Sequence, residues 1–150
     1  MKSLYQADSA AEIQERLGRL SASSSRQWGT MDAAQAMAHC ANAMDNATGD
    51  AKPPRMFVGR LIGPMVKKMA IANDKPLQRN SPTSPELKVA DARQLDVEKQ
   101  RLSGLIDKFV AAGPAGCTNH PHSFFGRMTP DEWGVLMYKH VDHHLKQFGV

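Results

Sequence analysis

Apolar residues recur at helical spacing along almost the whole chain, and there is almost no signal for strands. The periodic stretches predict four long helices, at about residues 9–21, 30–48, 91–112 and 129–148. The last has the clearest start, because Thr129 can cap it, Pro130 suits the first helical position and Glu132 completes a capping box. Each helix has one apolar face, so the sequence predicts an all-α fold in which four helices form a bundle.

Other helix ends are also marked in the sequence. Ser9 followed by Glu12 predicts a capping box at the start of the first helix, and Gly49 predicts the end of the second. Gly113 and Pro114 predict the end of the third helix.

The length of the chain fits one domain over residues 1–150, large enough to bury a core without disulfides. Its two cysteines, Cys40 and Cys117, are far apart and form no CxxC motif, which argues against a disulfide framework and a cysteine metal site. The N-terminal residues lack the apolar run of a signal peptide, and no segment has the roughly 18 continuous apolar residues of a membrane span. We therefore expect a cytoplasmic protein without a transmembrane segment.

Positive charge is concentrated in residues 52–79, between the second and third long helices. This basic segment has seven Lys and Arg residues against one acid, a net charge of +6 in a chain whose net charge is +4. Its apolar residues recur at helical spacing but are interrupted by Gly63 and Pro64, which predicts a short, bent helical excursion. The stripe consists of Phe57, Leu61, Ile62, Met65, Val66 and Met69.

We expect the apolar stripe of the basic segment to pack over the bundle with its lysines in solvent. The alternative is that this amphipathic segment meets an anionic partner or a membrane surface, which would make the protein a binding module. Nucleic-acid binding is not expected, because no exposed aromatics are interleaved with the basic residues and no recognition motif accompanies them.

The last helix carries two histidines, His140 and His144, four positions apart. Residues at this spacing lie on one face of a helix, where two imidazoles can converge on one point. The same face carries Trp133 and Leu136, which are expected to point into the bundle, so the histidines need partners there. His143 lies at the edge of this face, and geometry alone leaves it as an alternative to His144.

The second helix offers a further histidine, His39, within a polar stripe. This stripe consists of Asp32, Gln35, His39, Asn42 and Asn46. Taken alone, such a stripe is more typical of a helix face that meets water. If it lines a groove between helices, His39 faces the pair on the last helix, and helix spacings of about 8 to 10 Å let the three imidazoles reach one ion. Three histidines leave coordination positions open, as in a catalytic divalent metal site.

Two stretches, Trp28–His39 and His140–Gly149, resemble the DinB/YfiT-like superfamily of metalloenzymes, and the resemblance covers nearly the whole chain. The stretch Phe124–Trp133 is similar to one branch of that superfamily, known only as a bacterial domain of unknown function. The resemblance implies a DinB-like, up-down-down-up four-helix bundle that is often dimeric. It also implies a divalent metal held by three histidines in a cleft.

Carried over by position, the resemblance assigns the metal ligands to His39, His140 and His144, and it places Gln147 where the superfamily has a glutamine. Other branches have Arg-Gly-Gln after the second histidine of the pair, whereas this chain has Leu-Lys-Gln. Imidazole ligands suit zinc, nickel, iron or copper and do not select among them. Relatives include S-transferases and an isomerase that use a low-molecular-weight thiol, and some relatives are proposed hydrolases. The resemblance thus implies activation of a thiol or water toward a small electrophile.

Other polar residues are candidates for supporting roles. Gln35, one turn before His39, and Gln147 can orient a substrate or water, or they are ordinary surface amides. Glu98 is either a partner of a ligand or a solvated carboxylate at the edge of its helix. A metal- or ligand-binding module without catalysis is the alternative to an enzyme. His120 and His122 are expected to pack within a loop, and Cys40 is expected to be a structural thiol.

Overall fold

The computed structural model of the protein describes all 150 residues and is all-helical, as predicted. It contains five α-helices and two short 3-10 helices, and its only β-type pairing is an isolated bridge between His122 and Gly126. The elements are α1 (Ala7–Arg19), α2 (Ala33–Thr48), α3 (Phe57–Ile71), η1 (Pro85–Leu87), α4 (Leu95–Ala112), η2 (Pro114–Gly116) and α5 (Pro130–Gln147).

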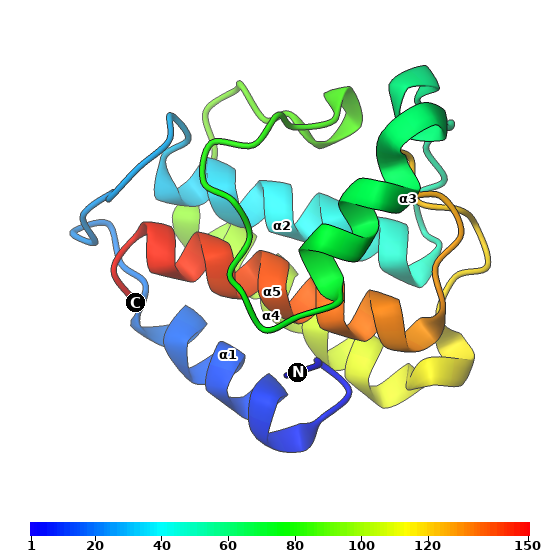
Figure 1. The fold of residues 1–150 in the computed structure, drawn as a ribbon. Coiled ribbons are helices and arrows are strands. Elements are labelled where there is room, and N and C mark those ends of the chain that lie inside the picture. Colours follow the sequence, from blue (N-terminus) through cyan, green and yellow to red (C-terminus); the bar gives the residue numbers. More distant parts are fainter.

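Helix α5 occupies the middle of the molecule (Figure 1). Helices α1 and α2 each pack against both α4 and α5, whereas α3 packs against α5 from outside this group. The core consists of 24 buried apolar residues, drawn mainly from α1, α2, α4 and α5, with Ile71 of α3 and Leu87 of η1 joining them. None of the five helices is both long enough and apolar enough to cross a membrane.

The predicted C-terminal end of α2 and the predicted start of α5 are confirmed. Thr129 and Glu132 form the capping box of α5, and Gly49 ends α2 in the left-handed conformation with φ of 83°. Helix α2 begins at Ala33 with a second capping box, in which the Asp32 and Gln35 side chains bond each other's backbone N–H groups.

The capping box predicted at Ser9 is wrong, because α1 begins two residues earlier, at Ala7. The Ser9 hydroxyl donates to Gln6 Oε1, 3.2 Å away, and the Glu12 carboxylate is engaged by Lys2 and Arg16 instead of the backbone. Helix α4 also begins later than predicted, at Leu95.

The short helical excursion predicted between the second and third long helices is confirmed as α3. Helix α3 is continuous over 15 residues with Pro64 inside it. A proline removes the N–H that would bond the carbonyl four residues earlier, here that of Arg60. Both Pro64 and Arg60 are solvent-exposed, so water can bond the carbonyl that the proline leaves free.

The orientation of α3 contradicts the expectation that its apolar stripe packs over the bundle. Its inner face carries Gly59 and Gly63, which lie so close to Phe124 that a Cβ atom at either would be 2.5 or 2.1 Å from the Phe124 carbonyl oxygen. Only glycine allows this close approach, so glycines face the protein. Six apolar side chains, 41% to 77% exposed, point away and form the outer face of α3, namely Phe57, Val58, Leu61, Ile62, Met65 and Met69.

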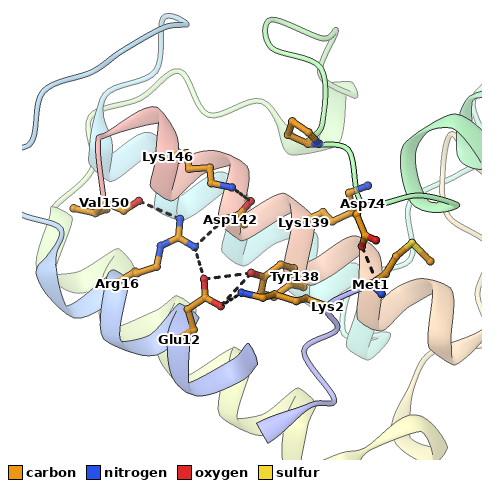
Figure 2. Close-up of a pocket in the computed structure, with 11 residues that line it drawn as sticks. Met1, Lys2, Glu12, Arg16, Asp74, Tyr138, Lys139, Asp142, Lys146 and Val150 are labelled. Carbon is orange, nitrogen blue, oxygen red and sulfur yellow. Dashed lines mark hydrogen bonds and ion pairs between the residues drawn. The ribbon is translucent and has the colours of Figure 1, made fainter. Parts of the chain in front are cut away.

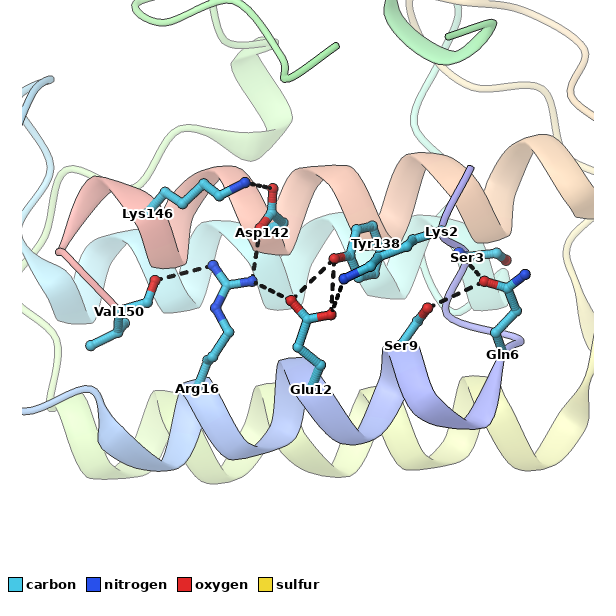
Figure 3. A network of polar contacts seen from close by, with 10 residues as sticks. All are labelled: Lys2, Ser3, Gln6, Ser9, Glu12, Arg16, Tyr138, Asp142, Lys146 and Val150. Carbon is cyan, nitrogen blue, oxygen red and sulfur yellow. Dashed lines mark hydrogen bonds and ion pairs between the residues drawn. The ribbon is translucent and has the colours of Figure 1, made fainter. Parts of the chain in front are cut away.

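Helix α5 is buried on more than its apolar face. A cleft of about 650 Å³ lies on the side of α5 opposite His140 and His144, lined by residues of the N-terminal segment, α1, α5 and the chain after α3 (Figure 2). At its floor Arg16 bonds Asp142 at 2.7 Å and Glu12 at 3.2 Å, within a polar network that joins α1 to α5 (Figure 3). The charges lining this cleft therefore already have partners within the chain.

Candidate metal centre

Three histidines from two helices meet at the interface of α2 and α5. His39 comes from α2, and His140 and His144 come from successive turns of α5. One ligand nitrogen of each lies within 4.8 Å of those of the other two, so the three could hold a metal ion. The Nε2 atoms of His39 and His140 are 2.8 Å apart. His39 and His144 are buried, and His140 is partly exposed.

The spacing of these nitrogens suits one ion. Two imidazole nitrogens at the usual 2.0 to 2.1 Å from a metal are about 2.8 to 3.4 Å apart at right-angled or tetrahedral geometry. The distance of 2.8 Å between His39 and His140 is close to the lower end of that range. The remaining separations between ligand nitrogens are at most 4.8 Å. The donor set therefore fits a divalent transition metal.

Hydrogen bonds behind two of the rings fix their orientation. His39 Nδ1 lies 2.8 Å from the backbone oxygen of Leu87, and His144 Nδ1 lies 2.8 Å from Oε1 of Gln147. Because both oxygens accept, each Nδ1 carries the hydrogen, and the Nε2 lone pair is left for the cluster. Histidine ligands of metals are typically held in this way by a carbonyl or carboxylate.

The surroundings keep the three imidazoles neutral at neutral pH. Burial lowers the pKa of His39. Burial, followed by the repulsion that His144 and His39 would exert on each other when protonated, lowers the pKa of His144 to about 3. Burial, together with the neighbouring imidazoles, also holds the pKa of His140 well below its usual 6.5. Neutral imidazole is the form that binds metals, so protons do not compete for these nitrogens at pH 7.

Residues 2–149 match the profile of the family described as "Protein of unknown function (DUF1569)". The chain belongs to the DUF1569 family. This match is consistent with the branch of unknown function that the sequence resembles. No curated protein and no solved structure matches the chain significantly.

His143 of this DUF1569 chain lies beside the cluster rather than within it. Its ring makes edge contacts with those of His144, at a centroid distance of 5.1 Å, and Trp28, at 5.4 Å. Burial, as the largest cause, lowers the pKa of His143, and the charge of Arg79 contributes. The Arg79 guanidinium itself stacks over the Trp28 ring at 4.0 Å.

Gln35 and Glu98 form their hydrogen bonds and ion pairs with residues other than the three histidines. Besides capping α2, Gln35 donates from Nε2 to the Asp91 oxygen at 3.3 Å. Glu98 is buried and pairs with Arg93 at 3.2 Å and with Arg101 at 3.5 Å. Both side chains thus hold the segment around residues 91–93, which follows the η1 turn that bonds His39.

Two backbone carbonyls of the DUF1569 site were not found from the sequence. The oxygen of Leu87 orients His39, and the oxygen of Trp28 accepts from Gln147 Nε2 at 2.8 Å. A carbonyl is present at every residue, so no side-chain pattern could have revealed either one. The placement of Arg79 over Trp28 was also missed, because its position depends on the path of the chain between α3 and η1.

The loop histidines behave as expected. His120 Nε2 lies 2.9 Å from the Pro53 oxygen, and His122 Nδ1 accepts the backbone N–H groups of Phe124 and Phe125. Neither belongs to the cluster. Cys40 is fully buried, which raises the pKa of its thiol, and it forms no disulfide.

Proposed function

We propose that this DUF1569 protein is a metal-dependent enzyme that activates a thiol or a water molecule toward a small electrophile. The observation that carries the proposal is the meeting of three neutral imidazoles, two of them oriented through Nδ1, at the interface of α2 and α5. In this proposal His39, His140 and His144 hold zinc, nickel or iron. The packing of α1, α2, α4 and α5 supports a single DinB-like four-helix bundle over residues 1–150.

A divalent metal with three protein ligands has positions left for another group and supplies Lewis acidity, which lowers the pKa of a thiol or water toward neutrality. The protein contributes orientation. Gln147 holds the His144 ring from behind and is itself held by the Trp28 carbonyl, so the ring does not have to be ordered when the ligand arrives.

Gln35 and Glu98 are assigned indirect roles in the proposed site. Gln35 bonds the backbone of Asp91, and Glu98 pairs with Arg93, so together they hold the segment that leads from η1 into α4. Through it they position the Leu87 carbonyl, which bonds His39 Nδ1. These residues are positioning groups, without contact with substrate.

Arg79 and His143 are proposed to face the substrate. Arg79 has no acidic partner among the ion pairs of the structure and lies over Trp28, whose ring contacts His143. A fixed positive charge here favours a substrate or thiol with a carboxylate, since guanidinium binds that group in two parallel hydrogen bonds. His143 is partly exposed and has a lowered pKa, so it is neutral at pH 7 and able to accept a proton.

The test is an activity assay on protein purified without a histidine tag and reconstituted with zinc, nickel or iron. Glutathione is paired with a panel of small electrophiles, and hydrolysis of the same electrophiles is followed without thiol. We expect turnover that the H39A/H140A/H144A variant loses by more than about a hundredfold and that the H120A variant keeps, because His120 bonds a loop carbonyl outside the cluster. Metal binding without turnover in any form would instead indicate a non-catalytic module.

A further inference from the structure

The outer face of α3 is the largest concentration of exposed apolar side chains on the molecule. Six of the eight large apolar residues that are exposed lie on this one helix, and the other two, Met1 and Val97, lie elsewhere. Phe57 is 77% exposed, and Leu61 and Met69 are each 69% exposed. Single exposed apolar residues are normal, but a continuous row along a helix marks a surface that something covers.

Helix α3 cannot bury this face by turning toward the bundle. The backbones of Gly59 and Gly63, on the inner face of α3, pack directly against Phe124. Lys67 bonds Glu132 of α5 at 2.8 Å, and the Lys139 ammonium bonds the backbone oxygens of Ala70 and Asn73 at the end of α3. These contacts fix the rotation of the helix and keep its apolar side chains outward.

The charged side chains on α3 all have the same sign. No acidic residue occurs between Asp50 and Asp74, so α3 and its flanks contain only cations. Lys67 is used in the ion pair with Glu132, whereas Arg60 and Lys68 are exposed and form no ion pair. At 100° per residue Lys68 falls at the edge of the apolar arc, and Arg60 falls beyond that same edge.

From this combination we infer that the outer face of α3 binds the interface of an anionic lipid bilayer. Exposed Phe, Leu, Ile and Met side chains beside free Lys and Arg are the composition of a helix that lies in the headgroup region. The apolar side chains enter the acyl boundary, and Arg60 and Lys68 meet the lipid phosphates. Because no helix can cross a membrane, the contact is peripheral.

A bilayer fits this face better than a protein partner does. The face is the convex side of a single helix, whereas peptide-binding sites are concave grooves. A second copy of the chain packed α3 against α3 would bring two sets of free Arg60 and Lys68 together, and like charges at an interface oppose association. Anionic lipid neutralises the same charges.

The test is flotation of the full chain with vesicles of phosphatidylcholine alone or mixed with phosphatidylglycerol, at low and high salt. We expect binding to the anionic vesicles only, weakened by salt. L61Q/M65Q and R60E/K68E should each reduce the partition by at least about tenfold. V97Q alters an apolar residue on α4 that is also exposed, at 54%, and should leave the partition unchanged. Circular dichroism checks that each variant is folded.

Three results would overturn the inference. The first is no binding to anionic vesicles, and the second is equal binding to both kinds of vesicle. The third is a wild type that forms a dimer in light scattering, does not bind vesicles, and becomes monomeric in the L61Q/M65Q variant. The outer face of α3 would then be an interface between two copies of the chain. None of these readouts depends on the metal or on catalysis.

Discussion

The Nε2 atoms of His39 and His140 lie 2.8 Å apart although 101 positions separate the two residues in the chain. The packing of α2 against α5 brings them together, and burial keeps both rings neutral. Withdrawing two imidazoles from water side by side costs free energy unless their nitrogens have bonding partners, and an apolar pair would not carry this cost. The pair is therefore the feature from which the predictions about the site follow.

Substitution of Gln147 should weaken metal binding. Gln147→Leu removes the oxygen that orients His144 and the N–H that bonds Trp28, so we expect an affinity about 10- to 100-fold lower, measured by competition with a chelator. Gln147→Glu keeps an acceptor for His144 but cannot donate to Trp28. It should retain most of the affinity while lowering the free energy of unfolding by about 1 to 3 kcal/mol. Equal loss of affinity in both variants would contradict this separation of roles.

A methyl group at Gly63 should loosen α3. The added Cβ would lie 2.1 Å from the Phe124 oxygen, so the helix or the loop must shift, and we expect Gly63→Ala to destabilise the protein by about 2 kcal/mol or more in urea unfolding. Gly104 in α4 has nothing within 4 Å of its added Cβ and provides the control. Gly104→Ala should stabilise the fold by about 0.5 to 1 kcal/mol. If Gly63→Ala left the free energy of unfolding unchanged, the close packing of α3 against Phe124 would be contradicted.

His122 should make stability fall in mild acid. Burial, and then the charge of Arg55, lower its pKa to about 4 in the folded state, against about 6.5 in the unfolded chain. Between these values the unfolded chain binds a proton that the folded chain does not, so the free energy of unfolding decreases as the pH falls from about 6.5 to 4. The loss from this residue is on the order of 3 kcal/mol at most.

His122→Asn retains an acceptor for the N–H groups of Phe124 and Phe125 but does not titrate. Urea unfolding at several pH values between 7 and 4 should therefore show a shallower decline for the variant than for the wild type. Parallel curves would mean that His122 is protonated equally readily in both states.

The ion pair of Arg16 with Asp142 should matter for stability but not for the metal. Both side chains are about nine-tenths buried, so Arg16→Met leaves a buried carboxylate with one partner fewer, and we expect a loss of about 3 kcal/mol. Arg19→Met removes an exposed pair with Glu15 and should change stability by less than about 0.5 kcal/mol. Metal content should be unchanged in both, because the pair lies across α5 from the histidines.

The sequence predicted the helices well where a local signal determines the structure. The capping box of Thr129 and Glu132 and the terminal Gly49 form because their partners are a few residues away. Ser9 and Glu12 have the same pattern but fail, since Lys2 and Arg16 engage the glutamate. The outward apolar face of α3 could not be predicted, because it depends on the fit of Gly59 and Gly63 against Phe124, which is distant in sequence.

The three histidines could be proposed from periodicity and from resemblance, because helical spacing determines which side chains share a face. Helical spacing alone left His143 as an alternative to His144, and the resemblance favoured His144. In the structure His144 belongs to the cluster and His143 lies beside it. The polar stripe of α2 does not simply face water, since His39 and Asn46 are buried. Backbone carbonyls, such as those of Leu87 and Trp28, produce no pattern in the sequence. The orientation of the imidazole rings could therefore not be predicted from it.

Metal analysis by mass spectrometry, on protein purified without a histidine tag and dialysed against one divalent metal, tests the central claim most directly. We predict about one ion per chain for the wild type and for H120A, and almost none for H39A or the triple variant. His39 is one of only three protein ligands, so its loss leaves two. A wild type that takes up no metal, or an H39A variant that keeps it, would contradict the account.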